Sequence, residues 1–279
     1  MRRLVVEGAA IAYEESGTGD GLPLLFLHGW TSDRSTWRHQ IPAFSHRHRC
    51  IAIDLPGHGG SDPVPGARYD IAFHAGRLAT FIAALGLEDA VPVGHSLGGV
   101  LALALAARPG ARHPAAVLVD PAPLLRTGPM QRSLERTAQM MRDLGRGRTQ
   151  EILGDKLFFR PTDPPELPAE IQRIAAATDE EAALRTWDGI VAHDAADDLR
   201  AVLVPLLFVN SDRPQNREDD IRALAARLHW GRTIGTGHFN HLVMPRQVNA
   251  MIADFLERLV PASQSGISPA PLPAAGATG

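Results

Sequence analysis

A short G-x-S-x-G pattern, Gly94-His95-Ser96-Leu97-Gly98, is the strongest chemical signal in this 279-residue sequence. It lies between an apolar run at 90–93 and an Ala/Leu-rich helical stretch at 100–107. A strand that passes directly into a helix needs a very tight turn, and glycines two residues before and after the serine remove the side chains that would clash there. The pattern therefore predicts a strained turn that exposes the Ser96 hydroxyl as a nucleophile.

A serine needs a base to remove its proton, and the base needs an acid that fixes its tautomer. His238 is predicted to be the base, because it lies in a glycine-flanked loop between a short strand and the last predicted helix. His241 is the nearest rival among the twelve histidines. The other histidines near the predicted site are expected to pack beside the serine or to brace loops: His95, His28 and His58.

Two positions are open for the acid. Asp120 follows the strand predicted at 115–119, next to the strand that carries Ser96, and from there a carboxylate can reach the imidazole. Asp212 comes early after the strand predicted at 205–209, and Pro214 stands where a carboxylate is expected. We favour Asp120 and keep Asp212 as the alternative acid. If Asp212 is the acid, Asp120 would instead hydrogen-bond backbone at the start of the segment that follows it.

An acyl-transfer reaction also needs two N–H donors for the developing oxyanion. One is expected from Leu97, the residue after the serine, at a helix N-terminus where the helix dipole helps. The other is expected from Trp30 in His28-Gly29-Trp30. The Trp30 side chain is also a candidate wall of the substrate pocket, since the backbone performs one role and the side chain the other.

Short apolar runs that alternate with helical spacing predict the scaffold of this site. Strands are predicted at these runs: 4–6, 11–15, 23–27, 49–54, 90–93, 115–119 and 205–209. Helices are predicted at 70–85, 221–228 and 248–259. This alternation indicates an α/β fold with a mainly parallel, twisted sheet and helices on both faces. Four polar residues that each follow an apolar run are expected to meet at the carboxyl ends of the strands: His28, Asp54, Ser96 and Asp120.

The segment 122–200 breaks this alternation. It is richer in Arg, Glu, Asp and Pro, and it predicts short helices at 129–144, 149–159, 168–177 and 180–193. We interpret it as a helical cap inserted between two strands, the alternative being helices that pack on the sheet edge. The predicted division is a core at 1–121 and 201–261, the cap at 122–200, and a flexible Pro/Ala/Gly/Ser-rich tail at 262–279.

Composition limits the classes of function. The net charge is −3 without long runs of one sign, which argues against nucleic-acid and membrane partners. The single cysteine, Cys50, lies in an apolar run and is expected to be a small core residue. No run approaches the roughly 20 apolar residues of a membrane span. With Glu7 soon after the N-terminal arginines, a secretion signal is not expected either, and we expect a cytoplasmic protein. We expect a small-molecule substrate, with no cofactor and no metal, because the paired histidines lack a third ligand at suitable spacing. The oligomeric state stays open.

These motifs together resemble the α/β-hydrolase superfamily over 23–120 and 205–259. The resemblance rests on His28-Gly29-Trp30, on 54–62, on 94–99 and on Gly237-His238-Phe239. It implies an α/β-hydrolase fold, a Ser-acid-His triad and a serine hydrolase that cleaves a carboxylic ester, thioester or lactone of a small to mid-sized apolar substrate. The departure is the position of the acid. Some members place the acid after the strand that follows the serine turn at 94–98, here called the elbow, and this supports Asp120.

Two alternative functions stay open. One group of the superfamily, the cofactor-free 2,4-dioxygenases of N-heteroaromatic rings, is similar around His28-Gly29-Trp30, Asp120 and 210–238. There the His/Asp pair deprotonates an organic substrate that then reacts with O₂, although the elbow pattern of that group differs from Leu97-Gly98-Gly99. The other alternative is a non-catalytic ligand receptor on the same fold.

Overall fold

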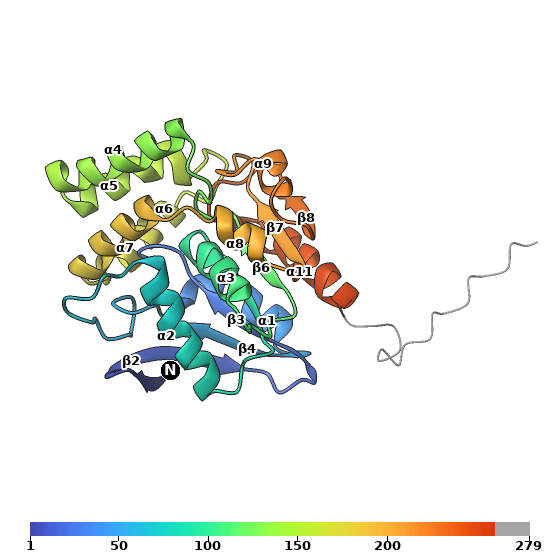
Figure 1. The fold of residues 1–279 in the computed structure, drawn as a ribbon. Helices are drawn as coiled ribbons and strands as arrows, with labels where there is room; N and C mark the ends of the chain where they lie inside the picture. Colours follow the sequence, from blue (N-terminus) through green and yellow to red (C-terminus); the bar gives the residue numbers. More distant parts are fainter. Residues whose placement is uncertain (260–279) are drawn as a thin grey trace, which may run out of the picture.

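One mainly parallel sheet forms the centre of the molecule, as predicted (Figure 1). The structure is a computed structural model that describes residues 1–259. Within that range the strands are β1 (Arg2–Val6), β2 (Ala9–Ser16), β3 (Gly21–Leu27), β4 (His48–Ile53), β5 (Val91–His95), β6 (Ala116–Val119), β7 (Leu206–Asn210) and β8 (Leu228–Arg232). Their order in space is β1-β2-β4-β3-β5-β6-β7-β8; β2 runs antiparallel to its two neighbours, β1 and β4, and the other pairs are parallel.

The strand order reverses between β3 and β5. The chain runs from β3 outward to β4 and then returns past β3 to β5, which pairs with β3 in parallel. In open parallel sheets a ligand binds beyond the carboxyl ends of the strands at such a reversal, because the connections leave in opposite directions and open a crevice there. The residues just past β3 and β5 are His28 and Ser96, so the topology itself selects this edge for a site.

The strands are buried on both faces. Alternate residues of β3 point to opposite sides, with Leu25 and Leu27 in one apolar cluster and Leu24 and Phe26 in another. Cys50 lies in the second cluster and is fully buried, as predicted, and burial raises the pKa of its thiol to about 12. The helices of the core are η1 (Arg34–Trp37), α1 (Gln40–Phe44), α2 (Ile71–Ala84), α3 (Leu97–Ala107), α9 (Glu218–Arg222), α10 (Asn240–Val243) and α11 (Pro245–Leu259).

The segment between β6 and β7 is helical and stands over the carboxyl-end edge of the sheet (Figure 1). It comprises α4 (Gly128–Leu144), α5 (Arg146–Leu153), the π-helical turn η2 (Gly154–Phe158), α6 (Leu167–Ala176), α7 (Glu180–Ala192) and α8 (Ala196–Ala201). The helix predicted at 149–159 differs from this, because regular helix ends at Leu153 and the π turn carries the chain on. Asp179 caps α7 by accepting a hydrogen bond from the Ala182 N–H at 2.9 Å.

One predicted helix is wrong. The spacing over 221–228 predicts a single helix, whereas α9 ends at Arg222 and Leu228 already belongs to β8. Ile221, Ala225 and Leu228 all enter the main core cluster. A short helix followed by a turn and a strand buries the same residues as one continuous helix, so apolar spacing does not separate the two arrangements.

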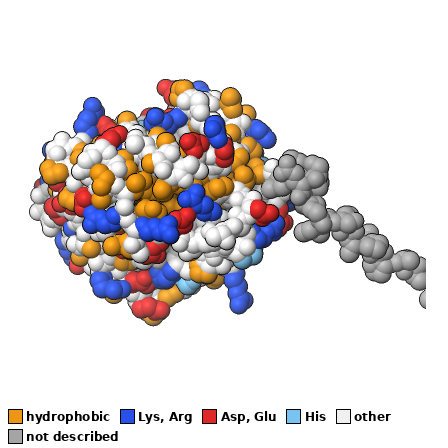
Figure 2. All heavy atoms as spheres, turned by 90° about the horizontal axis from the view of Figure 1, so that it is seen from below, with side chains coloured by type: hydrophobic (Ala, Val, Ile, Leu, Met, Phe, Trp, Pro, Cys, Tyr) orange, Lys and Arg blue, Asp and Glu red, His pale blue; other side chains and the backbone are white. Residues whose placement is uncertain are grey.

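The surface carries charges of both signs. Side chains of both signs are interspersed on the face that Figure 2 shows, in keeping with the small net charge. Among the described residues, the helices are all too short or too polar to cross a membrane. The predicted flexible tail at 262–279, with the last two residues of the predicted core, lies outside the described residues.

Candidate active site

Ser96 lies in a strained turn between β5 and α3. Its backbone φ is +54° and ψ is −116°, outside the regions that side-chain-bearing residues ordinarily occupy. A Cβ added to Gly94 would lie 1.9 Å from the Gly98 carbonyl oxygen, and one added to Gly98 would lie 2.0 Å from the Leu27 carbonyl oxygen. Both positions therefore require glycine. The turn leaves the Ser96 side chain half-buried in the wall of a pocket.

The structure brings Asp120 and His238 together. Asp120 directly follows β6 and has a left-handed conformation, with φ of +38°. Its Oδ2 lies 2.6 Å from His238 Nδ1, and its Oδ1 accepts a hydrogen bond from the Ser211 N–H at 2.8 Å. Both side chains are at most 5% exposed. A carboxylate in this position favours the tautomer with the proton on Nδ1, which leaves Nε2 to accept a proton.

Asp212 lies elsewhere. Its Oδ2 accepts a hydrogen bond from the Gly235 N–H at 2.8 Å and is 3.6 Å from the guanidinium of Arg160. Arg232 donates to the Asp212 carbonyl oxygen. These partners make Asp212 a support of the loop that leads to His238, while its carboxylate makes no contact with the imidazole in the described part of the chain.

The neighbouring histidines His95 and His241 make different contacts from His238. His95 donates from Nε2 to the His238 carbonyl oxygen at 2.9 Å, and the two rings are 4.6 Å apart. Burial holds the pKa of His95 well below 6.5, so the ring is neutral. His241 is fully buried and is absent from the pocket wall, where His95 and His238 both lie.

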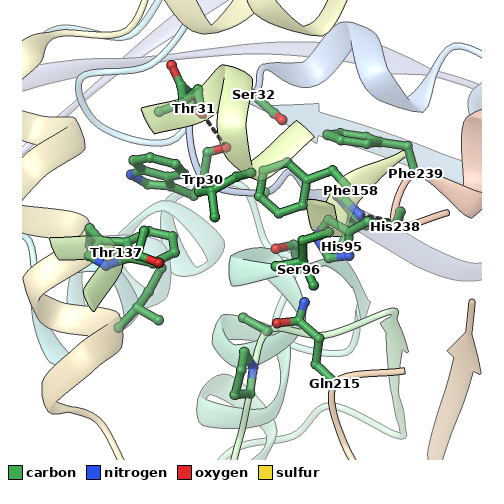
Figure 3. A pocket seen from close by; sticks show the side chains of 18 of the residues that line it. Trp30, Thr31, Ser32, His95, Ser96, Thr137, Phe158, Gln215, His238 and Phe239 are labelled. Carbon is green, nitrogen blue, oxygen red and sulfur yellow. Dashed lines mark hydrogen bonds between the residues drawn. The ribbon is translucent and has the colours of Figure 1, made fainter. Parts of the chain in front are cut away.

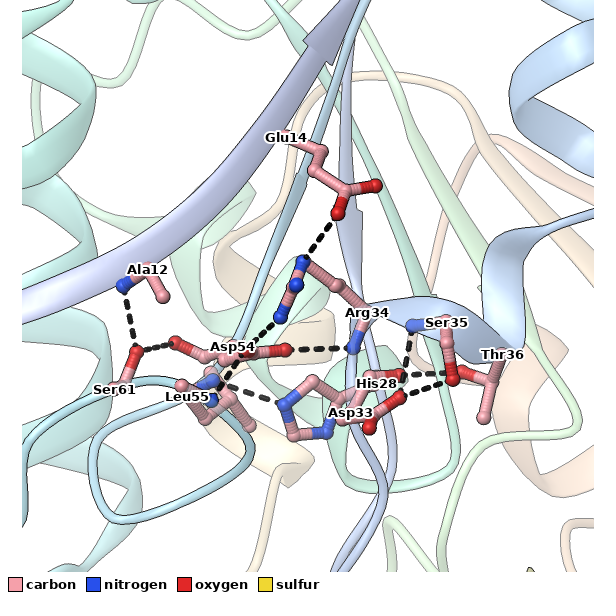
Figure 4. A network of polar contacts seen from close by, with 11 residues as sticks. Ala12, Glu14, His28, Asp33, Arg34, Ser35, Thr36, Asp54, Leu55 and Ser61 are labelled. Carbon is pink, nitrogen blue, oxygen red and sulfur yellow. Dashed lines mark hydrogen bonds and ion pairs between the residues drawn. The ribbon is translucent and has the colours of Figure 1, made fainter. Parts of the chain in front are cut away.

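A buried polar network fixes the loop that carries Trp30 (Figure 4). His28 donates from Nδ1 to the Gly29 carbonyl at 2.8 Å, and its Nε2 accepts from the Leu55 N–H at 2.9 Å. Burial lowers the pKa of His28 to about 4, which keeps the ring neutral. The buried Asp54 carboxylate pairs with the Arg34 guanidinium and accepts the Arg34 N–H at 2.8 Å. His28 therefore braces a loop, as expected from the sequence.

The two proposed oxyanion donors are the backbone N–H groups of Trp30, in the loop after β3, and of Leu97, directly after Ser96. Leu97 is the first residue of α3, so its N–H has no carbonyl in a preceding helical turn. Neither the Leu97 nor the Trp30 N–H has a hydrogen-bond acceptor within residues 1–259. The Trp30 indole donates to the Ala183 carbonyl at 2.8 Å and packs 4.7 Å from the Trp187 ring. The loop is thus tied to α7.

A cavity of about 300 Å³ opens beside Ser96 and His238 (Figure 3). Its wall from the helical segment is mostly apolar: Met130, Leu134, Leu153, Leu157, Phe158, Phe159, Ile171, Ala175, Trp187 and Ile190. The Phe158 ring stacks on the His238 ring at 5.2 Å, and the Phe158 carbonyl accepts the His238 N–H at 2.7 Å. The helical segment therefore touches the base directly.

Several polar residues of this pocket were missed by sequence reasoning. Gln150 of α5 donates to the Thr31 hydroxyl at 2.5 Å, and Arg213 and Gln215 come from the loop after β7. No motif marks them, since their position depends on how distant segments fold together. Within residues 1–259, no group of three or more His, Cys, Asp or Glu side chains is placed to hold a metal ion.

Comparison with known proteins identifies the family. The chain belongs to the alpha/beta hydrolase family, whose model matches residues 24–251. A non-heme haloperoxidase from Rhodococcus erythropolis is 30% identical over 269 residues, which cover 90% of this chain and 97% of the relative. A non-heme chloroperoxidase from Streptomyces lividans is 42% identical over 120 residues, 42% of this chain and 43% of that relative. The second match spans less than half of either protein.

The solved structures agree with this assignment. The thermophilic esterase from Thermogutta terrifontis, solved with malate bound, superposes with a TM-score of 0.80 at 25% identity, covering 93% of this chain and 99% of the esterase. The α/β-hydrolase fold expected from the motifs is confirmed. The protein is an enzyme of this family.

Proposed function

We propose that the protein is a serine hydrolase that cleaves a carboxylic ester, thioester or lactone through an acyl-enzyme on Ser96. One observation carries the proposal: Ser96, on its strained turn, lines the same pocket as His238, whose Nδ1 is held 2.6 Å from the Asp120 carboxylate. A nucleophile, a base and an acid that orients the base are the components of acyl transfer. The apolar wall suits a small to mid-sized apolar acyl group.

The proposed reaction has two halves. His238 Nε2 takes the Ser96 proton as Oγ attacks the substrate carbonyl, and the Leu97 and Trp30 N–H groups stabilise the resulting oxyanion. The tetrahedral intermediate collapses, and the imidazolium gives its proton to the leaving oxygen or sulfur. Water, deprotonated by His238, then attacks the acyl-enzyme and releases the acid. Asp120 keeps its hydrogen bond to His238 Nδ1 and stabilises the charged imidazolium.

The helical segment 122–200 has a defined role in this proposal. It acts as a cap on a core formed, within the described residues, by 1–121 and 201–259, and it covers Ser96 with apolar side chains. Removing water from the site strengthens the interactions with the oxyanion and protects the acyl-enzyme. Phe158 links the cap to the base, because its carbonyl binds the His238 N–H and its ring covers the imidazole.

The test is a comparison of the wild type with Ser96→Ala on a short-chain p-nitrophenyl ester. We expect kcat to fall at least about 1,000-fold, because no other group supplies the nucleophile. Ser133→Ala is the matched control, since Ser133 lines the same pocket on α4. A fluorophosphonate should label the wild type and the control but leave Ser96→Ala unlabelled. Turnover by Ser96→Ala within about tenfold of wild type contradicts the proposal.

The same variants address the two alternatives. A cofactor-free dioxygenase uses the His238–Asp120 pair without a covalent serine step. Oxygen uptake with a hydroxyquinolone substrate that survives Ser96→Ala would support that reaction in place of hydrolysis. A non-catalytic receptor would neither turn over the ester nor react with the fluorophosphonate.

A further inference from the structure

The loop after β7 forms one wall of the pocket. Three consecutive residues of this loop, Arg213, Pro214 and Gln215, line the cavity together with Ser96. The loop is held at both ends, because the Ser211 N–H donates to Asp120 and Asn216 is buried against the chain that follows β6. The three residues are therefore part of the pocket wall, with Pro214 and Gln215 half-buried and Arg213 exposed.

Gln215 offers hydrogen-bonding groups that the protein does not use. Figure 3 shows its side-chain amide pointing toward Ser96. The side chain is half-buried, and within residues 1–259 neither its amide nitrogen nor its amide oxygen has a hydrogen-bond partner. An amide carries two donors and one acceptor, and an unused set at the edge of an apolar pocket is available to a polar group of the substrate.

Arg213 gives this wall a positive charge. The pocket lining of the described chain contains no Asp, Glu or Lys and this single Arg. No carboxylate lies within 4.0 Å of the Arg213 guanidinium in the described part of the chain. The nearby acids are already engaged, Asp212 with Arg160 and the Gly235 N–H, and Asp163 with the N–H groups of Arg160 and Gly237. Arg213 is exposed and lines the pocket, so its unpaired charge is accessible to a ligand bound there.

We propose that Gln215 and Arg213 form a subsite for a carboxylate carried by the substrate. The ester or lactone would then bear a second, free carboxylate at the end of a short apolar chain, opposite the carbonyl that Ser96 attacks. The Gln215 amide donates to one carboxylate oxygen and Arg213 provides the counter-charge, an arrangement stronger than hydrogen bonds between neutral groups. This inference rests on the proposed hydrolase function and specifies its substrate class.

The first test uses matched p-nitrophenyl esters. The monoesters of succinate, glutarate and adipate carry a free carboxylate, and their methyl-capped counterparts have the same chain without the charge. We expect the ratio of kcat/KM for the charged ester over its neutral counterpart to exceed one for at least one chain length. Arg213→Gln and Gln215→Leu should each lower that ratio, Arg213→Gln by about tenfold, because a charge-assisted contact is lost.

Arg217→Gln is the matched control. Arg217 is on the same loop, its side chain is 79% exposed, it lies 3.9 Å from Asp220, and it does not line the pocket. Its removal should leave the ratio unchanged. If Arg217→Gln lowers the ratio as much as Arg213→Gln does, the preference comes from the general surface field and the subsite is overturned. A wild-type ratio at or below one for every chain length overturns it as well.

A binding experiment separates the subsite from the reaction. Glutarate is titrated into Ser96→Ala, with intrinsic tryptophan fluorescence as the signal, because two of the four tryptophans, Trp30 and Trp187, lie in the pocket wall. Binding that weakens with Arg213→Gln supports the subsite even if no ester is hydrolysed, an outcome in which the proposed function alone fails. Hydrolysis of neutral esters with no charge preference and no glutarate binding leaves the hydrolase standing and removes the subsite.

Discussion

The loops after β6 and β7 leave neighbouring parallel strands at the same edge of the sheet, yet they do different work. The β6 loop begins with Asp120, whose carboxylate contacts His238. The β7 loop gives Asp120 a backbone N–H through Ser211 and then lines the pocket with Arg213 and Gln215. The difference shows that Asp120 reaches the histidine while Asp212 does not, and that residues of the β7 loop line the pocket instead.

The two strand ends are fixed to each other. Val119 pairs with Val209, and the Asp120 N–H donates to the Val209 carbonyl at 3.0 Å. The left-handed backbone of Asp120 turns its side chain out of the strand, so that one carboxylate oxygen meets the His238 ring and the other meets the Ser211 N–H. Both oxygens of this buried carboxylate are thereby satisfied, which burial of a charge requires.

The largest effect is expected from removing the charge of the acid. In Asp120→Asn the amide no longer holds His238 in the required tautomer, and we expect kcat to fall by about 10³ to 10⁴. Asp212→Asn is the matched variant on the β7 loop and should lose less than about tenfold, because Asp212 supports backbone. Kinetics on a p-nitrophenyl ester, with thermal unfolding as the folding control, decide between them. A large loss confined to Asp212→Asn would reverse the assignment.

The second effect concerns the side chain that joins the two loops. Asn216, in the β7 loop, accepts the Leu124 N–H at 2.8 Å and donates to the Pro121 carbonyl at 2.9 Å. Asn216→Ala leaves these buried groups unpaired, and we expect the free energy of unfolding to fall by about 3 kcal/mol. Asn249 is the comparison: it is half-buried and donates to the His39 carbonyl at an exposed position, so Asn249→Ala should cost less, about 1 kcal/mol. Urea unfolding measures both, and equal losses would show that Asn216 does not couple the loops.

The sequence predicted the β6 loop, with Asp120 and its contact to His238, better than it predicted the β7 loop. Ser96 and Asp120 follow apolar runs that become β5 and β6, because the tight turn and the buried strand are both local properties. The Asp120–His238 contact joins residues 118 positions apart, and the glycine-flanked loop of His238 was enough to suggest it. Within the described residues, the strand predictions at 90–93, 115–119 and 205–209 agree closely with β5, β6 and β7.

The β7 loop was less predictable for a physical reason. Whether Gln215 faces solvent or the pocket depends on the hydrogen bonds that Asn216 makes to the chain after β6, and these have no local pattern. The absence of a local pattern also explains the wrong helix at 221–228, where the spacing of apolar residues was the only basis for the prediction. The Gln150–Thr31 contact likewise joins segments 119 positions apart.

The smallest effect should appear in the pH dependence of stability. It concerns His95, which donates to the backbone carbonyl of His238, the residue that the β6 loop contacts through Asp120. Burial depresses the pKa of His95 below the unfolded value of 6.5. Below pH 6.5, His95 therefore binds a proton in the unfolded chain but not in the folded protein. Its stabilisation is therefore fully present above pH 6.5 and is lost as the pH falls. Between pH 6.5 and 5, the free energy of unfolding of the wild type should drop more steeply than that of His95→Gln, by about 1 kcal/mol per pH unit. The exposed His46→Gln is the control and should follow the wild type. If the free energy of unfolding depends on pH in the same way for wild type and His95→Gln, His95 is protonated in the folded protein. The contact between His95 and the His238 carbonyl would then tolerate a charged His95 ring.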